Sequence, residues 1–198
     1  KSKVSPMSRS VLSFLPWAIG FNSFHPSGPL ESFADLMGFY RDALPKLRPG
    51  NFEKIKSNDP AKAAQIDGLI MALLLVDGLL CARADHQANK PLRLPVNELA
   101  EYRVDANHFE QQTVDFAWRR LCERYIRRSR DLLQASALLG KPWLSGMTYR
   151  LCIARTEQVL REIQVDPATA YAGGRSPKLM DRLTAMTRIL WRTLTGRR

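Results

Sequence analysis

The stretch Gly68–Gln87, GLIMALLLVDGLLCARADHQ, decides how this chain folds. Its uninterrupted apolar run covers Leu69–Val76, eight residues, and Asp77 follows directly. A membrane-spanning helix needs about 20 predominantly apolar residues, so this run is short for one. Apolar residues lie on every side of the predicted helix, and a helix of this kind is typical of a protein core. We therefore expect a helix that is buried all round.

Helical spacing also continues before this stretch, and no segment alternates apolar and polar residues as a strand does. The segment Glu31–Leu44 is predicted to be an amphipathic helix that ends at Pro45 and the Pro49-Gly50 pair. A polar segment then leads to Asp59 and Pro60. These two residue types are typical of an N-cap followed by the first helical position, so we expect the central helix to begin there and to run to about Ala84.

The rest of the chain is predicted to be helical as well. The expected elements are a loop over Asp85–Pro95, a short helix over Pro95–Tyr102 with Asn97 as a candidate cap, a long helix over Ala106–Leu139, with or without a break, capped by Asp105, a helix over Trp143–Ile163, a loop over Asp166–Pro177 and a basic helix over Pro177–Thr195. Six or seven helices of this length predict an all-α bundle with a layered core. We expect a polar tail, residues 1–10, and a single all-helical domain, residues 11–198.

The basic residues are concentrated in one part of the chain. The net charge is +11, and residues 119–198 hold 17 Lys and Arg against 6 Asp and Glu, whereas residues 1–118 hold 13 of each kind. This asymmetry predicts an anionic partner for the C-terminal part: RNA, anionic lipid headgroups or an acidic protein surface. The chain begins Lys-Ser-Lys and shows no secretory apolar segment, which fits a processed protein of the mitochondrial matrix.

The three cysteines, Cys81, Cys122 and Cys152, lie far apart within apolar helical patterns. We expect buried free thiols in a reducing compartment rather than a zinc site or a disulfide. Asp67 and Asp77 are ten residues apart, which places them about 80° apart around a helix, so they do not easily share one metal. A cap or a buried ion pair with an arginine is the expected role of both.

An arginine-rich segment, WRRLCERYIRRSRDLL, Trp118–Leu133, is the best candidate for a functional surface. Helical spacing turns Trp118 and Tyr125 inward and leaves arginines outside, where each can bind phosphate or carboxylate bidentately. The candidate partner-binding or phosphate-binding residues are Arg119, Arg120, Arg124, Arg127, Arg128, Arg130, Arg188 and Arg192. No exposed aromatic platform is predicted beside them, which argues against RNA recognition. No nucleophile, metal or cofactor signature is present, and we expect no catalytic residue.

The segment Leu92–Phe109, LRLPVNELAEYRVDANHF, resembles the stretch after the second aspartate-rich helix of squalene and phytoene synthases. It has the Leu-Pro step, the short helix, and then Val-Asp at a helix start. The C-terminal part is similar to the ending of the same family through Tyr149, Val159-Leu160, Ile163, Asp166, Arg175, Ser176 and Lys178. The resemblance implies a helical bundle of the isoprenoid synthase type, shortened between Leu44 and Ala61.

The chain departs from this family at the residues that carry the chemistry. In the family, paired carboxylates on two facing helices hold Mg²⁺ and a prenyl diphosphate, because the cations neutralise the leaving group. Counting back from Leu94-Pro95 places Ala82 and His86 at the two key positions of the second motif, and no paired aspartates follow Phe21-Asn22. The chain is more similar to the non-enzymatic branch that assists assembly of respiratory complex I, which shares Trp191-Arg192.

Together these observations predict a catalytically inactive scaffold. It is expected to act as an assembly factor or accessory subunit of a large mitochondrial complex, with the respiratory chain favoured, in the matrix or at the matrix face of the inner membrane. Two alternatives stay open. One is a component of the mitochondrial ribosome that contacts rRNA through the basic C-terminal half. The other is an active prenyl transferase or a binder of anionic lipid. We expect no cofactor, no metal and no transmembrane segment.

Overall fold

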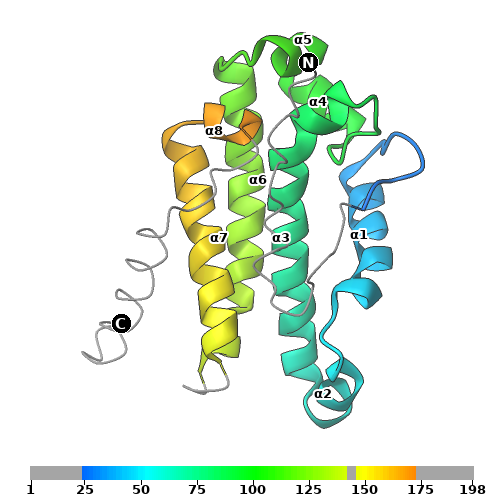
Figure 1. The fold of residues 1–198 in the computed structure, drawn as a ribbon, viewed down its shortest axis with the longest axis vertical. Helices are drawn as coiled ribbons and strands as arrows, with labels where there is room; N and C mark the ends of the chain where they lie inside the picture. Colours follow the sequence, from blue (N-terminus) through cyan, green and yellow to red (C-terminus); the bar gives the residue numbers. More distant parts are fainter. Residues whose placement is uncertain (1–23, 142–145, 173–198) are drawn as a thin grey trace, which may run out of the picture.

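The computed structural model describes residues 24–141 and 146–172. Within these ranges the regular structure is entirely helical and no strand occurs, which confirms the predicted all-α class (Figure 1). The α-helices are α1 (Phe33–Leu47), α2 (Phe52–Asn58), α3 (Pro60–Gln87), α4 (Val96–Tyr102), α5 (Ala106–Gln111), α6 (Phe116–Ala135), α7 (Met147–Val165) and α8 (Ala168–Tyr171), with a 3₁₀ helix over Ala137–Gly140. The predicted polar tail and the predicted basic helix with Arg188 and Arg192 lie outside the described residues.

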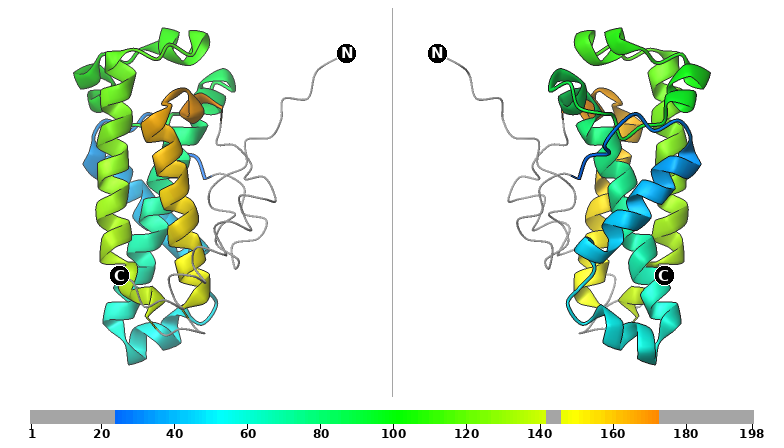
Figure 2. Two further views of the ribbon diagram at one scale, coloured as in Figure 1. Left: turned by 90° about the vertical axis from the view of Figure 1, so that its left-hand side faces the viewer. Right: turned by 90° about the vertical axis from the view of Figure 1, so that its right-hand side faces the viewer.

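Helix α3 runs through the centre of the bundle, with α6 and α7 along one side and α1 on the other (Figures 1 and 2). The helices α4, α5 and α8 lie toward one end of the bundle, and α2 lies at the other (Figure 1). Every residue from Leu69 to Ala82 is buried, which confirms the helix expected to be buried all round. By length and composition α3 could cross a membrane, but 78% of its most apolar window is buried inside the protein.

The longest packing contact joins α3 to α6. Trp118, Leu121 and Tyr125 are buried on the inner face of α6, as the helical spacing predicts. At one end of this contact, Ser136 donates a hydrogen bond of 2.9 Å to the carbonyl of Gln65 on α3. A Cβ on Gly68 would lie 3.0 Å from the Ser136 hydroxyl, so a glycine permits this close approach.

Several helix boundaries differ from the sequence predictions before α3. Helix α1 does not end at Pro45 but continues to Leu47, because a proline in the last turn removes one hydrogen bond without ending the helix. Arg48 then turns extended (ψ 148°), as expected of the residue that precedes Pro49. The polar segment after it forms α2, a helix that the sequence analysis did not predict. The start of α3 is as predicted: the Asp59 side chain accepts from the Lys62 amide, and Pro60 is the first residue.

The boundaries after α3 also needed correction. Helix α3 extends to Gln87, so Asp85 is helical and not part of a loop. Asn97 is not the cap of α4, because Pro95 occupies that position. The predicted long helix is two helices, α5 and α6, separated where Gln112 adopts the left-handed conformation (φ 56°). The predicted loop after α7 contains α8. The expected burial of Cys81, Cys122 and Cys152 as free thiols is confirmed.

Candidate functional site

The C-terminal half of α3 carries a buried polar cluster in the region where the resembled family places its second carboxylate motif. Asp77 and Asp85 both come from α3, about two helical turns apart. Arg93, from the loop after α3, joins them: its Nη1 lies 2.6 Å from Asp77 Oδ2, and its Nε donates to Asp85 Oδ2 at 3.1 Å. The Arg93 side chain is 1% exposed and that of Asp77 is 0% exposed. One guanidinium thus contacts two carboxylates in the core.

Three more polar side chains surround this cluster. His25 Nδ1 lies 3.8 Å from Asp85 Oδ1, and Lys90 Nζ lies 3.3 Å from His25 Nε2. Burial lowers the pKa of His25, so its ring is neutral near pH 7. The Tyr40 hydroxyl is fully buried and has no hydrogen-bond partner among the described residues, and burial raises its pKa well above the usual value. These groups make the rim of the cluster and leave the Arg93 ion pairs at its centre.

The contacts within this cluster indicate a structural role. A hard cation that carries a diphosphate needs several convergent carboxylate oxygens, and here a guanidinium contacts the oxygens that converge. In the described ranges, 24–141 and 146–172, no group of three or more His, Cys, Asp and Glu side chains is placed to hold a metal ion. The sequence interpretation of Asp77 as half of a buried ion pair with an arginine is confirmed. Asp67 also pairs with an arginine, as expected, but this pair is only half-buried: Arg48 binds it through two nitrogens at 2.8 and 2.6 Å.

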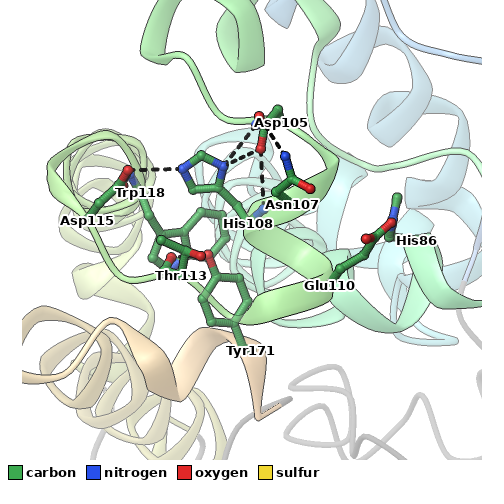
Figure 3. A network of polar contacts seen from close by, with 9 residues as sticks. All are labelled: His86, Asp105, Asn107, His108, Glu110, Thr113, Asp115, Trp118 and Tyr171. Atoms are coloured by element: carbon green, nitrogen blue, oxygen red, sulfur yellow. Dashed lines mark hydrogen bonds and ion pairs between the residues drawn. The ribbon is translucent and has the colours of Figure 1, made fainter.

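A second polar network joins α5 to α6 (Figure 3). Asp105 caps α5, and Asp115 caps α6 by accepting from the Trp118 amide at 2.9 Å. His108 lies between them, with Nδ1 2.7 Å from Asp105 Oδ1 and Nε2 3.2 Å from Asp115 Oδ2 (Figure 3). The hydrogen bond to His108 lowers the pKa of Asp105, and the Trp118 amide lowers the pKa of Asp115. This network fixes the junction between the two helices.

The other histidine of this region is also used internally. His86, at a key position of the resembled motif, lies 3.5 Å from the Glu110 carboxylate of α5 and packs its ring against Phe109 (Figure 3). Ala82, at the other key position, is buried in the core. Both positions therefore serve packing between α3 and its neighbours.

The predicted arginine surface divides into two groups. Arg128 and Arg130 are engaged inside the molecule: Arg128 Nη1 lies 2.6 Å from the buried Glu98 and over the Phe33 ring, and Arg130 binds Glu157 of α7. The other group is exposed, and within the described part of the chain none of its members has a carboxylate partner. We call it the α6 arginine surface; its members are Arg119, Arg120, Arg124 and Arg127.

An exposed aromatic residue adjoins this surface. Phe116, the first residue of α6, is 74% exposed. The Arg120 guanidinium lies 5.7 Å from the centre of its ring and 5.6 Å from the ring of Tyr102 on α4. The expectation that no exposed aromatic lies beside the arginines is therefore wrong. It failed because the helix break at Gln112 was not placed, so that Phe116 was not seen as the first residue of the arginine helix.

Comparisons with protein families, with curated proteins and with solved structures find no match for this chain. Over residues 24–141 and 146–172 the structure shows an all-helical fold, an Arg93–Asp77–Asp85 cluster against α3 and an arginine surface on α6 without carboxylate partners. The isoprenoid synthase type and the class of protein are proposals that build on these observations.

Proposed function

We propose that this chain is a catalytically inactive helical scaffold that serves as an accessory or assembly subunit of a large complex. The observation that carries the proposal is the α6 arginine surface, which is exposed and has no carboxylate partner among the described residues. The Arg93 ion pairs support the absence of prenyl chemistry, because they engage the two buried aspartates of α3. The bundle would supply a rigid frame, and α6 would dock the partner.

The spacing of the arginines supports docking over a purely structural role. Arg120 and Arg124 are four residues apart, and Arg127 follows three residues later, so they are neighbours on one side of α6. Like charges at these spacings destabilise a helix by a few tenths of a kcal/mol per pair. The exposed Glu123 and Asp131, three or four residues from Arg120 and Arg127, reduce that cost but do not balance all of the positive charge. Binding to an anionic partner offsets that cost, because it neutralises the charges and releases counterions.

The sequence resemblance gives the setting of the proposal: a mitochondrial complex in the matrix or at the matrix face of the inner membrane, with the respiratory chain favoured. The exposed Phe116 beside Arg120 supports the second candidate, a ribonucleoprotein such as the mitochondrial ribosome. Both candidates share the docking role of α6. Anionic lipid remains a third kind of partner for the same surface.

The native size of the protein tests the docking role. We would express tagged full-length chains in cells and separate their extracts on a gradient: wild type, the variant R120E/R124E/R127E, and the control R41E/K54E/K56E. The control reverses three exposed charges on α1 and α2. Wild type and control are expected in a large particle, and the α6 variant near the 22.5 kDa of the monomer. Migration of the wild type itself as a monomer would overturn the proposal.

The enzyme alternative has a direct readout. Purified chain would be incubated with farnesyl or geranylgeranyl diphosphate and Mg²⁺, and released diphosphate would be measured. We expect none above the buffer control, because Arg93 contacts both buried carboxylates of α3. Mg²⁺-dependent release that scales with protein, and that the variant D77N/D85N lacks while staying folded, would establish a prenyl transferase.

A further inference from the structure

We infer that the α6 arginine surface, together with Phe116, binds a single-stranded nucleic acid. The arginines would contact successive phosphates, and the phenyl ring of Phe116 would stack on a base. This inference rests on the proposed docking role of α6 and names the chemistry of its partner. RNA and DNA share that chemistry, and the experiment below separates them.

The first step of the argument is the row of charge. Arg120, Arg124 and Arg127 extend along about 10 Å of α6 and lie within about 60° of its surface. Each side chain is exposed, and no ion pair joins any of them to a carboxylate of the described residues, although Glu123 and Asp131 lie nearby on α6. One strand of a nucleic acid carries a phosphate about every 3.4 Å along the axis, so several phosphates fit along this row. Arg119 lies about 80° from Arg127 and widens the row at its N-terminal end.

The second step is the aromatic residue at the end of the row. Phe116 is four residues before Arg120, so it continues the same row toward the N-terminus of α6. Its ring is 74% exposed, and the Arg120 guanidinium lies 5.7 Å from the ring centre. Proteins that bind single strands combine a positive track for the backbone with aromatic rings and guanidinium planes on which bases stack. The pairing of Phe116 with Arg120 provides both in one place.

Other anionic partners fit this surface less well. An acidic protein face satisfies the guanidiniums, but it offers no flat group for the exposed ring of Phe116. A helix that binds the membrane interface inserts a whole apolar face, and the apolar face of α6 is buried against α3 through Trp118, Leu121 and Tyr125. An RNA duplex is recognised over many base pairs by its shape, whereas this row covers about 10 Å.

Fluorescence anisotropy with labelled 12-nucleotide single strands of RNA and of DNA tests the inference on the purified full-length chain. The variant R120Q/R124Q/R127Q is expected to weaken binding. It is also expected to reduce the slope of log K against log salt by about 2, since each phosphate contact contributes about 0.7 for single strands. The control R41Q/K54Q/K56Q removes the same charge from α1 and α2 and is expected to keep the slope.

The variant F116A separates stacking from charge. Loss of one stacked base is expected to weaken binding roughly 10-fold, while the salt slope stays that of the wild type. The control V165A shortens another exposed apolar side chain, 83% exposed at the end of α7, and is expected to bind as the wild type does. Circular dichroism and urea unfolding would check that each variant is folded. Binding to either single strand supports the inference, and a preference for RNA or for DNA identifies the source.

Three outcomes would overturn it. The first is no binding by the wild type, and the second is a salt slope that the α6 variant and the α1–α2 control reduce equally. The third is binding to vesicles of anionic lipid that needs Phe116, without binding to either single strand. A large particle in cells that resists nuclease but is lost in R120E/R124E/R127E would overturn the nucleic acid while the docking role stands. A monomeric wild type in cells would instead remove the docking role.

Discussion

Arg93 is a charged residue that is almost completely buried in the core. Its side chain is 1% exposed and contacts two carboxylates, Asp77 and Asp85, both on α3. Burial raises the pKa of Asp85, and the guanidinium of Arg93 acts in the opposite direction. The sequence indicated that Asp77 would pair with an arginine. It could not show which one, because the loop that carries Arg93 returns to α3 through packing and not through local spacing.

Loss of the Arg93 charge is expected to destabilise the fold strongly. The variant R93M leaves two buried carboxylates without their cation, and removing one partner of a buried ion pair costs about 3–5 kcal/mol. The control R48M removes a half-buried pair with Asp67 and is expected to cost about 1 kcal/mol or less. Urea unfolding followed by circular dichroism measures both. Equal costs for the two variants would show that the Arg93 cluster is not buried as described.

Tyr40 and Gly78 form a second pair of interdependent residues. A Cβ on Gly78 would lie 2.6 Å from the Tyr40 hydroxyl and 3.0 Å from the Arg93 carbonyl. The variant G78A is therefore expected to cost about 1–3 kcal/mol through overpacking. The variant Y40F removes a buried hydroxyl without a hydrogen-bond partner and is expected to be neutral or stabilising.

A double-mutant cycle of unfolding free energies checks this pair. In the Y40F background, G78A is expected to cost less than it does alone, because the hydroxyl that the new methyl group meets is gone. Part of the cost should remain, since the Arg93 carbonyl is still 3.0 Å away. Strictly additive effects of the two substitutions would contradict the close approach of Tyr40 to α3.

At the scale of helices, local signals predicted starts better than ends. Asp59-Pro60 and Asp105 marked two helix starts correctly, because a capping side chain acts on amides within three residues of itself. The break at Gln112 was missed because no Gly or Pro marks it; a glutamine adopts the left-handed conformation there. Just after Gln112, Asp115 caps the start of α6 and contacts His108 of α5, and these contacts stabilise the junction between the two helices.

The junction of α5 and α6 is expected to weaken in acid. The pKa values of Asp105 and Asp115 are lowered from the usual 3.8, so each carboxylate adds stability above that pH and loses it as the pH falls through the lower, folded-state value. The variant D105N/D115N keeps an oxygen at both caps but does not titrate. Its melting temperature is expected to lie below that of the wild type at pH 6, with the difference shrinking toward pH 3. A constant difference between them would contradict the role of the charges.

At the scale of the whole molecule, the sequence predicted the all-α class and the core but not how the arginines would be shared. The spacing placed six arginines outside the buried face of α6. Arg128 and Arg130 then find Glu98 and Glu157, which lie 30 and 27 residues away in the chain. Such pairs depend on how α4 and α7 pack against α6. Arg119, Arg120, Arg124 and Arg127 form no ion pair with the described residues and are exposed.

The difference between the paired and the exposed arginines of α6 can be tested by measuring stability. The variant R120Q/R124Q/R127Q removes unpaired surface charges and is expected to change the free energy of unfolding by about 0.5 kcal/mol or less. The single variant R128Q removes the cation that faces the Glu98 carboxylate, which is 5% exposed and keeps its hydrogen bond from the Tyr125 hydroxyl, and is expected to cost about 2 kcal/mol. Chemical unfolding measures both. A triple variant less stable than R128Q would mean that the outer arginines hold the fold together.

Helix α3 also has a consequence for how the chain is made. It is long and apolar enough to be taken for a membrane span, yet α6, which makes the most extensive contact with it among the described helices, is synthesised later. While α6 is still inside the ribosome, α3 has already emerged, and the apolar surface that α6 will later cover is exposed. A nascent chain in that interval needs a chaperone that holds apolar segments, and translation products that stop before α6 are expected to aggregate or enter bilayers. The helix that forms the core of the folded protein is thus also the segment of the nascent chain that we expect to be most prone to aggregation.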